Sequence, residues 1–94
     1  MIRPAGEERM KHATPAALDT IEDVLGSVRR HAPLTERKRG VFYQHSAAFL
    51  HFHEDPAGMF ADLKEGSDFV RYRINTAGEK KRFLAAVTRV LGKP

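Results

Sequence analysis

The sequence predicts an α+β fold, a two-layer sandwich in which both helices cover one face of an antiparallel meander sheet, in the order α-β-β-β-β-α. Two observations carry this prediction. Apolar residues recur every three or four positions between residues 14 and 33 and again between 76 and 92, which is typical of amphipathic helices. Between these segments the period falls to two, and aromatic and β-branched residues become common, as they are in strands.

The first helix is expected to begin at Thr14-Pro15, because a threonine hydroxyl can accept an orphan backbone N–H and proline suits the first helical position. Pro33 ends the segment. Its apolar stripe consists of Leu18, Ile21, Leu25 and Val28. The last helix is expected to begin with a capping box formed by Thr76 and Glu79, and to end near Gly92.

Four strands are expected between the helices, at residues 41–44, 47–53, 59–64 and 69–74. Residues 55–58, Asp-Pro-Ala-Gly, match a type I turn, and residues 65–68 form a second turn around a glycine. Short turns of this kind join antiparallel neighbours, so a meander is the simplest topology.

Length and composition indicate one domain, at residues 14–92, preceded by a flexible tail at residues 1–13 that contains few large apolar side chains. The 94 residues include 16 Lys and Arg against 12 Asp and Glu, a formal net charge of +4, and no cysteine. Disulfides and thiolate chemistry are therefore excluded, and a cytoplasmic location is expected. The sequence has neither an apolar run long enough to cross a membrane nor a signal-peptide pattern.

Alternation along the strands sorts their side chains into two sets, because neighbouring residues of a strand point to opposite faces. The set expected beneath the helices is Leu50, Phe52, Met59, Ala61, Leu63, Val70, Tyr72 and Ile74. The set expected on the other face is Phe49, His51, His53, Phe60, Asp62, Lys64, Phe69, Arg71 and Arg73. This second face combines aromatic, imidazole and cationic groups, and it is the part of the sequence that suggests a function.

The first hypothesis for this face is a binding module for nucleic acid or another anionic partner, such as an acidic protein. Lys64, Arg71 and Arg73 would contact phosphates, and Phe49, Phe60 and Phe69 would provide apolar contacts. Aromatic rings beside cations on an open sheet are typical of platforms for single-stranded nucleic acid. A basic loop adds further cations at Arg29, Arg30, Arg37, Lys38 and Arg39.

Two other hypotheses stay open, besides an ordinary solvated face. His51 and His53 lie two apart on one strand, and Asp62 lies on the expected neighbour, a combination that suits a divalent metal ion. Alternatively the aromatic residues mediate contact in a weak homodimer of an otherwise monomeric protein.

Catalytic constellations are missing from the sequence. The chain has no Gly-x-Ser-x-Gly elbow, P-loop or dinucleotide fingerprint, and its serines lie in a helix or in turns. No catalytic residue and no organic cofactor is therefore predicted, and the sequence indicates a binding protein rather than an enzyme.

The segments GVFY at 40–43, AFLHFHEDPAG at 48–58 and FADLK at 60–64 resemble a family of short bacterial proteins with no established activity. The resemblance covers roughly residues 14–92 and implies a shared fold. More distantly, the helix, the aromatic-rich strand pair and the closing helix resemble the MmcQ/YjbR type of protein, whose fold is similar to CyaY. That resemblance implies DNA binding.

Overall fold

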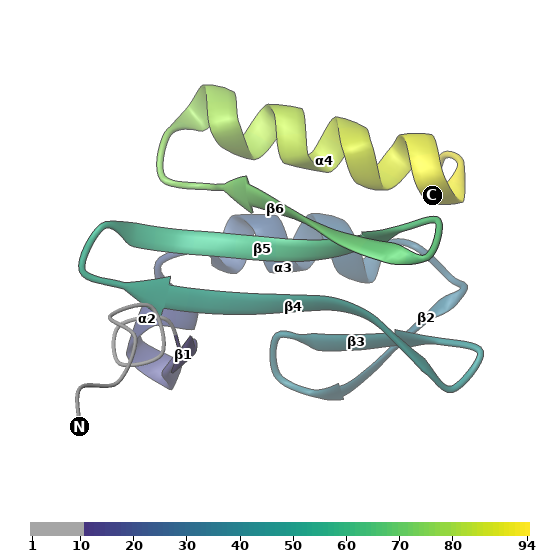
Figure 1. Cartoon of the computed structure of the whole chain (residues 1–94), viewed down its shortest axis with the longest axis horizontal. Helices are drawn as coiled ribbons and strands as arrows, with labels where there is room; N and C mark the ends of the chain where they lie inside the picture. Colours follow the sequence, from purple (N-terminus) through teal and green to yellow (C-terminus); the bar gives the residue numbers. More distant parts are fainter. Residues whose placement is uncertain (1–10) are drawn as a thin grey trace.

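The computed structural model of the chain describes residues 11–94. In this part of the chain, six strands form one antiparallel sheet with the order β2-β3-β4-β5-β6, and β1 pairs with β4 (Figure 1). The strands are β1 (Lys11–His12), β2 (Leu34–Lys38), β3 (Val41–Gln44), β4 (Ala47–Asp55), β5 (Gly58–Glu65) and β6 (Asp68–Arg73). Strands β2 to β6 pair in sequence order, so the sheet is the expected meander.

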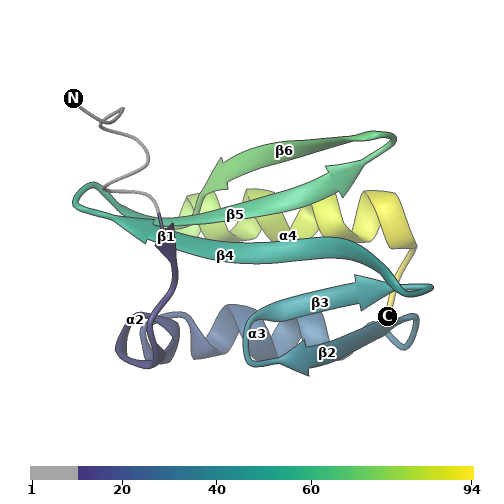
Figure 2. The same cartoon turned by 60° about the horizontal axis from the view of Figure 1, so that its bottom comes forward.

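The helices of the described residues are α2 (Pro15–Asp19), α3 (Glu22–Arg29) and α4 (Ala77–Leu91). Figure 2 shows α3 and α4 behind the sheet, on the same side of it. The predicted α+β sandwich with its helices on one face is therefore confirmed.

The core lies between this helix pair and the sheet. Phe52 of β4 is its centre, with edge-to-face ring contacts at centroid distances of 6.4 Å to Phe42 and 6.0 Å to Phe83. The other buried apolar residues are Leu18, Ile21, Val24, Leu25, Val28, Phe49, Leu50, Met59, Ala61, Leu63, Ile74, Ala86 and Val87. Most of the set expected beneath the helices is thus buried, but Val70 on the edge strand β6 is 39% exposed.

Both predicted helix starts are confirmed by their caps. The Thr14 hydroxyl accepts a hydrogen bond from the Ala17 N–H at 3.2 Å. At α4 the Glu79 N–H donates to the Thr76 hydroxyl, and the Thr76 N–H donates to the Glu79 carboxylate, each at 3.1 Å. These bonds satisfy backbone donors that a helix leaves unpaired at its first turn.

The first helical segment is divided in two, where the sequence predicts one helix. The Thr20 hydroxyl donates to the Ala17 carbonyl at 2.6 Å, and the Thr20 N–H also donates to this carbonyl. The backbone of Ile21 then leaves the helical region, with φ −121°, while its side chain enters the core. A hydroxyl that competes for a helical carbonyl and a β-branched neighbour both weaken a helix at this point.

Two strands were not expected from the sequence. β2 contains Arg37 and Lys38, which were assigned to a loop, and it pairs with β3 as the edge of the sheet. β1 pairs His12 with His53, so residues 11 and 12 belong to the sheet rather than to a flexible tail. Residues 1–10 of the predicted tail lie outside the described residues.

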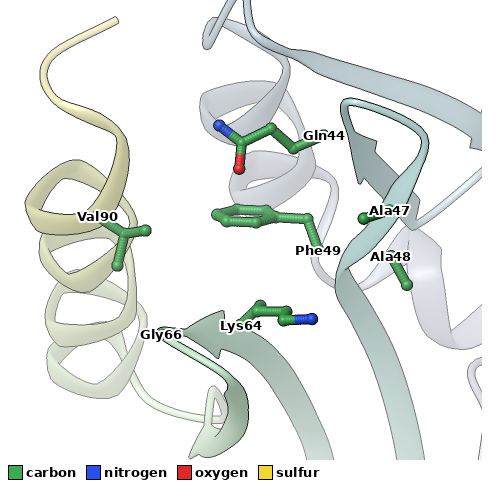
Figure 3. Close-up of a pocket in the computed structure, with 7 residues that line it drawn as sticks. All are labelled: Gln44, Ala47, Ala48, Phe49, Lys64, Gly66 and Val90. Atoms are coloured by element: carbon green, nitrogen blue, oxygen red, sulfur yellow. The ribbon is translucent and has the colours of Figure 1, made fainter.

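The prediction for Phe49 was wrong, because strict alternation would place it on the face opposite the helices. The pairing of β3 with β4 joins Phe42 to Leu50 and Tyr43 to Ala48, so Phe49 is an extra residue in a β-bulge. Phe49 and Leu50 are both buried, at 3% and 0% exposure. Figure 3 shows the Phe49 ring pointing from β4 toward Val90 of α4.

This placement predicts different costs for two phenylalanine substitutions. Phe49→Ala should lower the free energy of unfolding by about 3 kcal/mol or more, because it leaves a cavity in the core. Phe69→Ala should cost about 1 kcal/mol or less, since Phe69 is 42% exposed. Urea unfolding followed by circular dichroism measures both. Equal costs would contradict the bulge and its inward-facing ring.

Candidate functional site

The candidate site is the sheet face that α3 and α4 leave uncovered, here called the open face (Figure 2). Cross-strand pairing brings its members together in rows across β4, β5 and β6. It consists of His12, Arg37, Tyr43, His51, His53, Phe60, Asp62, Lys64, Phe69, Arg71 and Arg73. All the predicted face residues except Phe49 therefore lie on the expected side, and three more residues join them from β1, β2 and β3.

Asp62 is the electrostatic centre of the open face. Its two carboxylate oxygens accept hydrogen bonds from Nε and Nη2 of Arg71, at 2.7 and 2.8 Å. Nε2 of His53 lies 3.2 Å from the same carboxylate. Burial opposes ionisation of Asp62, but the hydrogen bonds and charge of Arg71 outweigh it and hold the pKa of the carboxyl below its usual value. The charge of Arg71 is therefore largely neutralised within the protein.

Three imidazoles lie beside this ion pair. Ring centroids are separated by 5.0 Å between His12 and His53 and by 6.1 Å between His51 and each of the other two. Burial is the largest influence on His51 and His53, and it lowers the pKa of both rings although the Asp62 charge acts in the opposite direction. Both rings are therefore mainly neutral at pH 7.

The structure brings the predicted metal ligands His51, His53 and Asp62 together only in part. His53 lies beside Asp62, but both oxygens of Asp62 are engaged by Arg71. Among residues 11–94, no three His, Asp, Glu or Cys side chains are arranged to hold a metal ion. The sequence could not show this, because Arg71 reaches Asp62 only through the pairing of β5 with β6.

Phe69 on β6 is the most exposed aromatic ring of the open face, and it is flanked on two sides. The His51 ring lies 5.2 Å away at a tilt of 30°, and Nζ of Lys64 lies 5.7 Å from the centroid of Phe69. Phe60 of β5 is half-buried further along the open face, where it pairs with His53 and Arg73. The result is a patch in which an accessible ring adjoins a cation.

A second ring and cation pair lies toward the other edge of the sheet. The guanidinium of Arg37 covers the Tyr43 ring at 4.3 Å from its centroid. Sequence analysis does not predict this pair as part of the face, because it places Arg37 in a loop. The sequence feature that could have indicated this pair is the polar segment before Gly40, which is typical of an edge strand.

The predicted basic loop does not form one cluster. Arg29 is paired with Glu22 and Glu36, each at 2.6 Å, and Arg39 with Asp19 and Glu22, each at 2.8 Å. These pairs lie on the helix side of β2. Two of the five expected cations are thus neutralised by acids of the first helical segment, because the fold brings β2 beside it.

Arg30 does not join this network, and Lys38 forms no ion pair among the described residues. Arg73 of the open face lies 3.3 Å from Glu79, but 57% of its side chain is exposed. Its guanidinium therefore remains accessible from the open face.

A small hollow opens at one end of the sandwich, next to the open face (Figure 3). It has a volume of about 190 Å³, with Phe49, Val90 and Lys64 among its lining residues. Lys64 thus lies at the border between this hollow and the aromatic patch.

Comparisons with protein-family models, with curated proteins and with solved structures gave no match. The resemblances to the family of short bacterial proteins and to the MmcQ/YjbR type stay predictions. Within residues 11–94, no helix combines the length and apolar character needed to cross a membrane.

The buried imidazoles predict a dependence of stability on pH. The native state holds the pKa of His51 and His53 below the unfolded value of about 6.5, so the unfolded chain binds their protons first. The free energy of unfolding should therefore be highest above this value and fall as the pH decreases toward 5. Urea unfolding between about pH 5 and 8 measures it.

The double variant His51→Gln/His53→Gln tests whether these two imidazoles cause the dependence of stability on pH. It should flatten the dependence, leaving the part due to His31, whose pKa burial also lowers. An unchanged slope in the double variant, or imidazole titration midpoints at or above 6.5 by NMR, would show that these rings are not the cause.

Proposed function

We propose that this chain is a binding module that holds single-stranded nucleic acid on the open face. The observation that carries the proposal is the accessible Phe69 ring, flanked by the Lys64 ammonium and the His51 imidazole. Bases stack on aromatic rings, and neighbouring cations interact with phosphates. Since 42% of Phe69 is exposed, part of the ring is accessible to a ligand.

The distribution of charge supports an extended anionic ligand. The centre of the face is neutralised by the Asp62–Arg71 pair and by uncharged imidazoles. Lys64, Arg73 and Arg37 lie around this centre, on three different strands. A chain of phosphates could follow these cations while its bases face the rings between them.

The rings offer more than one stacking position. Phe69 and Tyr43 lie on β6 and β3, with β4 and β5 between them. Adjacent strands are about 4.8 Å apart, so the two rings are separated by roughly 14 Å across the sheet. This span suits a segment of a few nucleotides rather than a single base.

Fluorescence anisotropy with a labelled mixed-sequence DNA of about 12 nucleotides tests the proposal. Binding should weaken as NaCl rises from about 50 to 200 mM, because counterions are released when Lys and Arg meet phosphates. Phe69→Ala should reduce affinity at least about fivefold through lost stacking. Lys64→Gln should reduce the slope of log K against log salt by about 0.7.

Two matched controls lie outside the open face. Val70→Ala removes an apolar side chain of similar exposure from the opposite face of β6, and Lys81→Gln removes an exposed charge from α4. Both should bind like the unmodified protein. Absence of binding at low salt, or equal losses in the control variants, would overturn the proposal. Self-association that Phe69→Ala abolishes, without any DNA binding, would instead assign the face to a homodimer.

A further inference from the structure

A second hollow lies in the helix layer, on the opposite side of the sheet from the open face. It is formed by the C-terminal ends of α3 and α4, and its volume is about 440 Å³. Its lining includes Ser27, Arg30, His31, Leu84, Thr88 and Lys93. We call it the helix-end hollow. No residue of the open face contributes to it, so it is independent of the proposed nucleic-acid site.

The charged side chains of the lining, Arg30 and Lys93, are both cationic, and Pro94 at the end of the chain lies beside them. Arg30 and Lys93 contribute two positive charges, and neither forms an ion pair with another described residue. This contrasts with Arg29, the neighbour of Arg30, which is held by Glu22 and Glu36. Cations near helix C-termini offset the helix dipole, which accounts for these two charges but not for the groups between them.

His31 is the lining residue whose presence the helix dipole does not explain. It is the buried polar residue of the described chain, at 5% exposure, and its ring forms no hydrogen bond with another described residue. No fully enclosed side-chain nitrogen or oxygen among the described residues lacks a partner, so the ring nitrogens of His31 reach the hollow that the residue lines. Because these nitrogens are open to the hollow, water or a ligand held there can be their hydrogen-bond partner.

Two hydroxyls complete the arrangement. Ser27 of α3 and Thr88 of α4 line the same space, and the side chain of neither one forms a hydrogen bond with another described residue. Burial and the nearby Arg30 charge lower the pKa of His31, so the ring enters as a neutral donor of one N–H. Together the hollow is lined by hydroxyl and imidazole donors and by two cations, a donor set that suits an oxyanion.

We propose that the helix-end hollow binds a small phosphomonoester. The phosphate would lie among Arg30, Lys93 and His31 and accept hydrogen bonds from the two hydroxyls. The volume exceeds what an inorganic phosphate occupies, and Leu84 supplies an apolar wall for the organic part of the ligand. A phosphomonoester can use both the phosphate-binding groups and the apolar wall, whereas inorganic phosphate can use only the phosphate-binding groups.

Titration of the full chain with phenyl phosphate, followed by 1H–15N NMR, tests this site. Phenyl phosphate should shift the amide resonances of residues 27–31 and of Thr88, and phenol should not, because it lacks the charge. Inorganic phosphate should shift the same resonances but bind more weakly, since it has no contact with Leu84. Arg30→Gln and Lys93→Gln should each weaken binding about tenfold, as expected for a charged hydrogen-bonding partner.

Lys38→Gln is the matched control, because it removes one exposed charge at the end of β2 from a residue that does not line the hollow. His31→Leu should remove binding while keeping an apolar side chain in the buried position. Arg30 and Lys93 are exposed, so their variants test the site even if His31→Leu does not fold. The proposal is overturned if phenyl phosphate and inorganic phosphate bind equally, if Lys38→Gln weakens binding as much as Lys93→Gln, or if the shifts fall on the open face.

Discussion

Strand β4 is the constraint on which the rest of the structure depends. Its nine residues pair with β5 along one edge and with β3 and then β1 along the other. Its buried residues, Phe49, Leu50 and Phe52, hold the helices, while His51 and His53 point to the open face. The register of β4 against β5 therefore decides at once which rings form the core and which groups meet on the outside.

One consequence of this register is the arrangement of charge on the open face. His51 pairs with Asp62, and Asp62 pairs in turn with Arg71, so a carboxylate is placed between imidazoles and a guanidinium. The charge of Asp62 is compensated by these neighbours, and the other cations of the open face lie around it. A one-residue slip would turn all of these side chains toward the core, where unpaired charges are costly. The same pairing that stabilises the core thus defines the open face.

Periodicity was sufficient to predict the strands that alternate cleanly. His51, His53, Phe60, Asp62 and Phe69 lie on the face that alternation assigns to them, and the capping signals mark both helix starts. This works because burial of one sheet face forces a period of two on the sequence.

The features that periodicity missed depend on contacts between distant segments. The bulge at Phe49 adds one residue to β4, but the amino-acid composition of the strand gives no sign of it. Strict alternation therefore places the ring on the wrong face. β2 is a polar edge strand with little apolar pattern, and β1 is defined only by its pairing with β4. The pairs of Arg29 and Arg39 and the unpartnered ring of His31 follow from how the helices pack, which local sequence does not encode.

We propose that the face left open by β4 and its neighbours binds single-stranded nucleic acid. Mapping of amide chemical shifts during titration with a short oligonucleotide tests it most directly. Shifts that concentrate on β4, β5 and β6, with the largest near Lys64 and Phe69, are the predicted result. Shifts confined to α3 and α4, or no shifts at low salt, would contradict it.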